Sequence, residues 1–224
     1  MELLNVARAR SMWLFDINDL NPRGKSVLSD ILEWLKNSYV FSKFPASIND
    51  QEAQTKALAF LQGNFQLREE FFIDVDLRLY NDGIIADTRS STDDTDLFLN
   101  DVLESASKEF NLSYRPGLVR KKLYASEVNV RCDHPLSNLN PKLKAISDKL
   151  STLVTTALPP LPPLVFDFSA ISFWAELLTP TPVAFRFERK QNSSFSENRY
   201  YSSAPLQTPV HLSLLEELES ILSG

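Results

Sequence analysis

The chain has 224 residues, of which 43% are hydrophobic and 11% aromatic, and its formal net charge is −6. This composition supplies ample material for a buried core and argues against global disorder. The negative charge argues against binding nucleic acid or an anionic membrane through the overall electrostatic field. A lone cysteine, Cys132, excludes an intrachain disulfide and fits a reducing, cytoplasmic compartment. No stretch approaches the ~18 uninterrupted apolar residues of a membrane span, and no signal peptide is evident.

The first part of the chain predicts helices before strands. Residues 1–20 have the pattern of a short amphipathic helix followed by an apolar cluster that begins at Trp13. Apolar residues at helical spacing predict a helix over 26–36, and a strand is expected over 58–67.

The strongest local pattern is a β-hairpin over residues 71–89. Its first half alternates apolar and polar residues, and Asp82-Gly83 supplies the two positive-φ positions of a two-residue turn. Such a turn fixes which residues face each other across the hairpin. The expected opposed pairs are Arg78 with Asp87, Asp76 with Arg89, and Tyr80 with Ile85.

Capping residues and prolines mark the remaining elements. In chain order these are a helix after the cap Ser91, a strand over 119–132, a helix after the cap Asn140, strands over 165–178 and 183–190, and a helix from Thr208. His211, in the first turn of the last helix, is expected at the surface.

These elements predict an α+β fold with a mainly antiparallel sheet and helices packed on one face, because strands and helices are interspersed without regular βαβ units. We expect a single domain over residues 1–224. A proline-rich connector at 155–164 is expected to separate residues 1–154 from a smaller β-β-α portion, 165–224.

One set of residues suggests an enzyme. Asp167 lies on one predicted strand, and Glu188 and Lys190 share a face of the next. This arrangement resembles the acidic residue plus E-x-K pattern of the restriction-endonuclease-like nucleases. The resemblance implies that the two carboxylates would bind Mg²⁺ and that the lysine would help to activate the attacking water. It covers only these few residues, and they are also explained as the polar face of an ordinary strand.

A second set favours a non-catalytic role. The segment 195–205 is rich in Tyr, Arg, Asn and Ser, a composition typical of recognition surfaces. Within it, Arg199, Tyr200 and Tyr201 are the expected interface residues. Since no coherent catalytic set and no cofactor motif is found, the sequence favours a non-catalytic interaction or assembly subunit of a cytoplasmic complex. Its partner would be another protein or a second copy of the chain, and the metal-dependent nuclease is the alternative.

Overall fold

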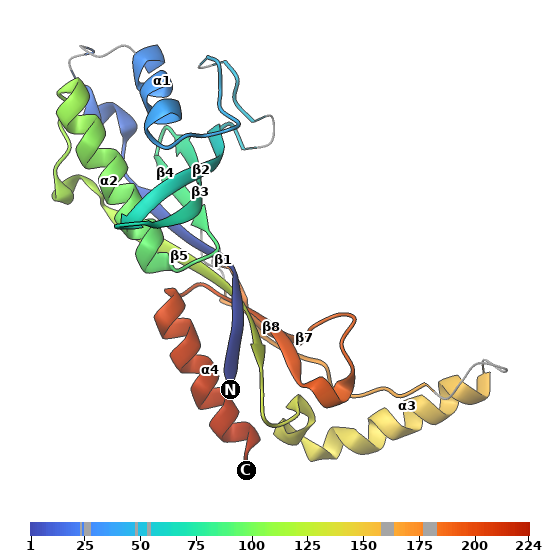
Figure 1. The fold of residues 1–224 in the computed structure, drawn as a ribbon. Coiled ribbons are helices and arrows are strands. Elements are labelled where there is room, and N and C mark those ends of the chain that lie inside the picture. The colour runs from blue at the N-terminus through green and yellow to red at the C-terminus, as the bar shows by residue number, and fades with distance from the viewer. Residues whose placement is uncertain (23, 25–27, 48, 53–54, 158–163, 177–182) are drawn as a thin grey trace. The chain divides into compact units, whose positions relative to one another are not determined.

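The computed structural model describes residues 1–22, 24, 28–47, 49–52, 55–157, 164–176 and 183–224. Within these ranges the fold is α+β, as predicted, with an eight-stranded antiparallel sheet and four α-helices (Figure 1). The strands are β1 (Glu2–Leu14), β2 (Leu58–Arg68), β3 (Phe71–Tyr80), β4 (Gly83–Thr88), β5 (Lys121–Arg131), β6 (Ala170–Phe173), β7 (Phe185–Arg189) and β8 (Arg199–Ala204). The helices are α1 (Leu28–Ser38), α2 (Thr92–Phe110), α3 (Lys144–Ala157) and α4 (Thr208–Leu222).

The chain divides into two compact units. The N-terminal unit comprises Val6–Ser126 with Pro205–Pro209, and the C-terminal unit comprises Met1–Asn5, Glu127–Ala204 and Val210–Gly224. The strand order is β2-β3-β4-β1-β5-β8-β7-β6, and β1 and β5 contribute residues to both units. The expected connector at 155–164 has residues of the C-terminal unit on both sides, and a domain boundary there stays a prediction. Residues 158–163 of that connector lie outside the described residues.

The first element is a strand, and the predicted N-terminal helix was wrong. Strand β1 pairs with β4, with Ala9 opposite Thr88 and Arg10 opposite Asp87. Alternate residues of its second half, from Ala9 to Trp13, are buried, as expected for a strand with one face on a core. Tertiary pairing therefore overrides a weak local helix pattern.

The hairpin forms, but its predicted register was wrong by two residues. Tyr80 lies opposite Gly83, so that the turn consists of Asn81 and Asp82. The carbonyls of these two turn residues accept hydrogen bonds from Ile17 N and Phe15 N, each of 3.0 Å. The segment after β1 thus anchors the turn, a long-range constraint that the hairpin sequence does not contain. A shift of two residues keeps every side chain on its predicted face.

Charge pairing in the hairpin changes with this register. Asp76 lies opposite Asp87, and Arg78 lies opposite Ile85. Arg78 still reaches Asp87, at 3.0 Å between Nη1 and Oδ2, and Arg10 of β1 donates to the same carboxylate at 2.7 Å. Asp76 Oδ1 instead accepts a 2.8 Å hydrogen bond from the backbone of Gln62. The guanidinium groups of Arg78 and Arg10 at Asp87 offset the repulsion between the facing carboxylates of Asp76 and Asp87.

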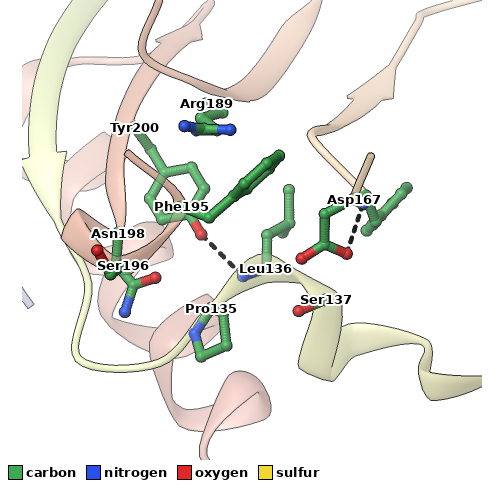
Figure 2. A pocket seen from close by; sticks show the side chains of 10 residues that line it. Pro135, Leu136, Ser137, Asp167, Arg189, Phe195, Ser196, Asn198 and Tyr200 are labelled. Carbon is green, nitrogen blue, oxygen red and sulfur yellow. Dashed lines mark hydrogen bonds between the residues drawn. The ribbon is translucent and has the colours of Figure 1, made fainter. Parts of the chain in front are cut away.

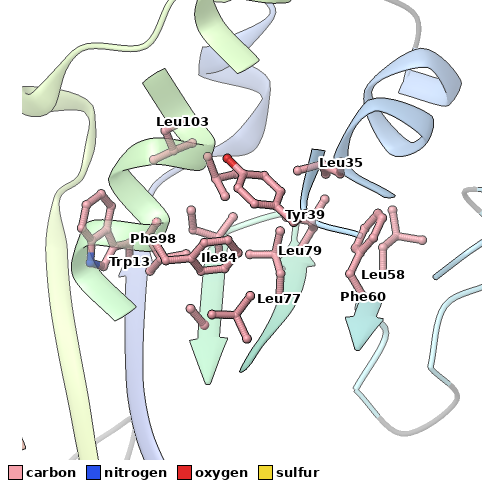
Figure 3. Close-up of a cluster of buried hydrophobic side chains, with 14 of the residues drawn as sticks. Trp13, Leu35, Tyr39, Leu58, Phe60, Leu77, Leu79, Ile84, Phe98 and Leu103 are labelled. Atoms are coloured by element: carbon pink, nitrogen blue, oxygen red, sulfur yellow. The ribbon is translucent and has the colours of Figure 1, made fainter. Parts of the chain in front are cut away.

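The core of the N-terminal unit lies between the sheet and helices α1 and α2. Figure 3 shows Leu35 of α1 and Phe98 of α2 against Leu77 and Ile84 of the hairpin. Helix α2 begins after Ser91, whose side chain accepts a hydrogen bond from Asp93 N, as the capping pattern predicts. The predicted helix over 26–36 and strand over 58–67 correspond to α1 and β2.

The C-terminal unit is built from shorter elements. Of the strand predicted over 165–178, only Ala170–Phe173 forms β6, and residues 177–178 lie outside the described ranges. Asn140 makes no capping hydrogen bond, and α3 begins at Lys144 after a single 3₁₀ turn. None of the helices in the described ranges combines the length and the apolarity that a membrane crossing requires.

Candidate interaction surface and pocket

A pocket of about 330 Å³ lies within the C-terminal unit (Figure 2). Its walls come from the turn after β5, from the residues before β6, from β7, and from the 3₁₀ turn that precedes β8. The lining residues are Pro135, Leu136, Ser137, Asp167, Phe168, Arg189, Phe195, Ser196, Asn198 and Tyr200. Two of them, Asp167 and Tyr200, belong to the residue sets predicted from the sequence.

Tyr200 is a wall of this pocket and not an exposed anchor. Its side chain is 5% exposed and stacks on Phe187 with ring centroids 4.6 Å apart. The hydroxyl accepts a 2.8 Å hydrogen bond from Leu136 N, and burial raises the pKa of the phenol. Strand alternation turns Tyr200 inward, and its part in an interface stays a prediction.

Its two neighbours lie closer to solvent. Arg199 is exposed and forms an ion pair with Glu197, at 3.3 Å between Nε and Oε2. Tyr201 is partly buried and lies opposite Glu188 of β7. Their part in an interface stays a prediction.

The charged groups of the pocket are Arg189 and Asp167. The Arg189 guanidinium lies 3.6 Å from the centroid of the Phe195 ring and also donates to the carbonyl of Ser193. Asp167 Oδ1 accepts a 2.8 Å hydrogen bond from Phe168 N. A stacked guanidinium and a carboxylate bound to its own chain hold the pocket walls in place.

The structure does not bring together the three residues of the nuclease pattern. Glu188 lies opposite Ala170 in the β6–β7 pair, and Lys190, two residues on, shares its face. Arg189, between them, points to the other face, where it lines the pocket with Asp167. Within the described ranges, no group of three or more His, Cys, Asp or Glu residues is arranged to hold a metal ion.

Helix α3 carries a row of exposed apolar side chains. Ile146, Leu150 and Leu153 are 66%, 42% and 57% exposed, and no residue of the helix is buried. Their spacing places them on one face. The adjacent face binds the segment that leads into β6, where Phe166 N donates to Ser151 Oγ at 2.9 Å. In Figure 1 this segment runs beside α3 (yellow).

Helix α4 exposes a second apolar row. Val210, Leu214 and Ile221 are 50%, 38% and 61% exposed, while Leu215 and Leu222 on the opposite face are buried. The helix contains three glutamates and no lysine or arginine. Its exposed face is therefore both apolar and acidic.

His211 is buried, so its predicted surface position was wrong. Its side chain is 0% exposed, and Nε2 lies 2.9 Å from Ser202 Oγ, which itself donates to the carbonyl of Arg186. Nδ1 has no hydrogen-bond partner among the described residues, and burial lowers the pKa of the imidazole to about 4. The signal was in the sequence, since His211 is four residues before Leu215 on the buried stripe. A fully buried Ser–His pair offers no route to a substrate and is a packing feature.

Comparisons with known proteins yield little. No family model matches the chain, and no curated protein matches it. Among solved structures the chain is similar to Methanococcus jannaschii TBP, with a TM-score of 0.45 and 9% sequence identity, over 99% of this chain and 97% of that one. A similarity of this size carries no property over to the present protein.

Proposed function

We propose that the protein is a non-catalytic assembly subunit that binds a second copy of itself, with α3 of one copy packed on α4 of the other. The observation that carries this proposal is the apolar row of α3, which nothing in the described residues covers. Contiguous exposed apolar side chains of this kind mark interaction sites.

The length of α3 indicates that another surface must pack on its apolar row to stabilise it. Isolated helices shorter than about 12–15 residues are marginal in water, and α3 has 14 residues. Helices in proteins are stabilised mainly by packing an apolar face, with roughly 1.5–3 kcal/mol for each fully buried Leu or Ile. The apolar row of α3 supplies that stabilisation only when another surface covers it.

Charge complementarity favours α4 of a second copy as that surface. The apolar row of α3 is accompanied by Lys149 and by Lys144, which pairs with Asp148, and Lys142 lies in the 3₁₀ turn before the helix. The exposed face of α4 is accompanied by Glu216 and Glu217. Residues 142–149 contain three lysines and one aspartate, a net charge of +2, on a chain whose net charge is −6. A basic apolar helix thus faces an acidic apolar helix, which selects this pairing over α3 with α3.

The test is sedimentation velocity over a concentration series. The double variant Leu150→Ser, Leu153→Ser should dissociate at least about 30-fold more readily, the effect of losing ~2 kcal/mol at an interface centre. The matched control is Leu97→Ser in the N-terminal unit, because Leu97 and Leu153 are both 57% exposed. It should associate like the parent.

A charge exchange tests the orientation. Lys149→Glu and Glu217→Lys should each weaken self-association, and a mixture of the two variants should restore it between unlike copies. A parent chain that stays monomeric at every concentration overturns self-assembly. Assembly without restoration in the mixture overturns the pairing of α3 with α4.

The nuclease alternative has no geometric support, because Asp167 lies on the other side of β7 from Glu188 and Lys190. It stays a prediction with a direct test. Mg²⁺-dependent cleavage of DNA or RNA by the parent, abolished by Glu188→Ala, would establish it.

A further inference from the structure

A second cavity, of about 360 Å³, lies within the N-terminal unit. It opens between α1, α2 and the β3–β4 hairpin, and its floor consists of buried apolar side chains, among them Leu35, Leu79, Ile84 and Leu103. Figure 3 shows these four side chains directed toward one another from both helices and the sheet. Protein interiors are normally close-packed, so a space of this size beside a core is a candidate ligand site.

Part of the described wall of this cavity is open to solvent. Leu28 and Ile31 of α1 line it and are only partly buried, although the other side of α1 is packed in the core through Leu32. A cavity of about 360 Å³ lies at the small end of the range of ligand pockets, roughly 300–1,000 Å³. The occupant that fits this space is a small apolar molecule.

Among the described residues that line the cavity, one is a cation. Lys56 lines the mouth with a backbone φ of 57°, a left-handed conformation that is costly for a residue other than glycine. Two backbone hydrogen bonds fix it there, from Lys56 N to Glu52 O at 2.8 Å and from Glu52 N to Ala57 O at 2.9 Å. These bonds fix the backbone at Lys56, a residue that lines the cavity.

Nearby carboxylates do not neutralise this lysine. Glu52 pairs with Arg78, at 3.6 Å between Oε2 and Nε, and Asp19 pairs with Arg120 at 3.4 Å. In the part of the chain that the structure describes, no carboxylate forms an ion pair with Lys56. The other polar side chains among the described lining residues are the phenol of Tyr80 and amides, including those of Asn18 and Gln51.

We infer that this cavity binds a small apolar monocarboxylate, with the hydrocarbon part against α1 and α2 and the carboxylate at Lys56. This site is independent of the proposed self-association, since it lies in the other unit. The apolar floor supplies affinity, and the lysine supplies the preference for an anion.

Octanoate and its neutral isostere octanamide, each with ten non-hydrogen atoms, are suitable probes. Isothermal titration calorimetry on the full chain should detect octanoate binding, with octanamide weaker by about fivefold, the effect of one exposed ion pair. Lys56→Gln should remove this preference, so that octanoate and octanamide bind the variant with equal affinity. The variant is expected to fold, because Lys56 is exposed and outside the core.

A second variant tests the cavity itself. Ala106→Phe places a large ring in the lining wall of α2 and should abolish binding of both probes. If Ala106→Phe fails to fold, Ile31→Trp on the partly exposed wall of α1 serves the same purpose. No binding of octanoate to the parent overturns the inference, as does unchanged binding after the cavity is filled. Preference for octanoate that survives in Lys56→Gln overturns the role of the lysine.

Discussion

Helices α2 and α3 carry the same kind of apolar stripe, but only α2 buries it. Seven residues of α2 are buried, including Phe98 and Leu99, whereas α3 has none. Both stripes follow helical spacing, so the pattern that predicts a helix also predicts a face that needs a cover. It does not say whether the cover belongs to the same chain. In the N-terminal unit the sheet provides it, and in the C-terminal unit we attribute it to a second copy.

The two helices also differ at their ends, because α2 is capped and α3 begins without a side-chain cap. Ser91 caps the start of α2, Asp93 and Asp94 occupy its first turn, and Asn111 ends it in a left-handed conformation. Lys144, where α3 begins, follows a 3₁₀ turn without a side-chain cap. Helix α2 is therefore specified locally and by packing, while α3 depends on packing that the described part of the chain does not supply.

The sharpest test of this contrast applies one substitution to both helices. Leu99→Ala should lower the free energy of unfolding by about 2–5 kcal/mol, because Leu99 is 0% exposed and a cavity would remain. Leu153→Ala should change it by less than about 0.5 kcal/mol in dilute solution. Urea denaturation at low protein concentration measures both.

Protein concentration separates the two helices further. A partner that binds only the folded chain raises its apparent stability as concentration rises. The loss of unfolding free energy caused by Leu153→Ala should therefore grow at high protein concentration. The loss caused by Leu99→Ala should stay constant. Equal losses from both variants in dilute solution would contradict the contrast.

The next largest loss in stability is expected at Gly83, where two backbone segments of the N-terminal unit lie close together. A Cβ on Gly83 would lie 2.3 Å from the carbonyl oxygen of Trp13, on the paired strand β1. Gly83→Val should therefore cost roughly 3 kcal/mol or more, which chemical denaturation measures. Gly117→Ala is the control, because a Cβ there meets nothing within 4 Å. Destabilisation of the same size at both glycines would show that the contact with β1 is unimportant.

The buried histidine of the C-terminal unit should make the stability of the protein fall at acid pH. His211 has a folded pKa of about 4, below the usual 6.5, so the unfolded chain binds the proton more tightly. The contribution of the neutral His211 imidazole to the free energy of unfolding is complete above pH 6.5. It is lost as the pH falls from 6.5 to about 4. The shift corresponds to roughly 3 kcal/mol. Unfolding measured across this range should show a steeper acid loss in the parent than in His211→Gln.

The other histidine of the chain provides the control for this pH profile. His134→Gln should retain the acid dependence of the parent, whereas His211→Gln should flatten it. Parallel profiles for the parent and His211→Gln between pH 6.5 and 4 would exclude His211 as the titrating group.

Much of the fold could be predicted because local signals agree with the tertiary structure. The Ser91 cap and the alternation in β3 each predicted an element that forms. The failures lie where distant residues decide. β1 is a strand because β4 pairs with it, and the hairpin turn is Asn81–Asp82 because the chain after β1 binds both carbonyls.

The positions of the candidate site residues also depend on tertiary structure. Tyr200 and Tyr201 are equivalent in composition, but strand alternation buries Tyr200 against Phe187 and leaves Tyr201 nearer the surface. Asp167 and Glu188 fall on different sides of β7, which depends on a register that the sequence does not state. The apolar row of α3 was visible in the sequence, but its exposure was not.

A smaller effect is expected from the Tyr200 hydroxyl. Tyr200→Phe keeps the ring on Phe187 and leaves the backbone N–H of Leu136, a buried residue, without its acceptor. The expected loss in stability is about 1–2 kcal/mol, with self-association unchanged. Denaturation and sedimentation velocity together check this. If Tyr200→Phe weakens self-association and keeps the stability of the parent, the Tyr200 hydroxyl contributes to the interface.

The smallest effects concern Arg199 and Tyr201, the remaining residues of the predicted interface. Arg199 is exposed and paired with Glu197, and Tyr201 is partly buried, so neither resembles the desolvated anchor of an interface centre. Arg199→Ala and Tyr201→Ala should each weaken self-association by less than about fivefold, as expected for rim residues. The Leu150→Ser, Leu153→Ser variant provides the scale in the same sedimentation experiment. If Tyr201→Ala weakens association more than that variant does, the contact surface is centred on β8, and α3 loses its assigned role.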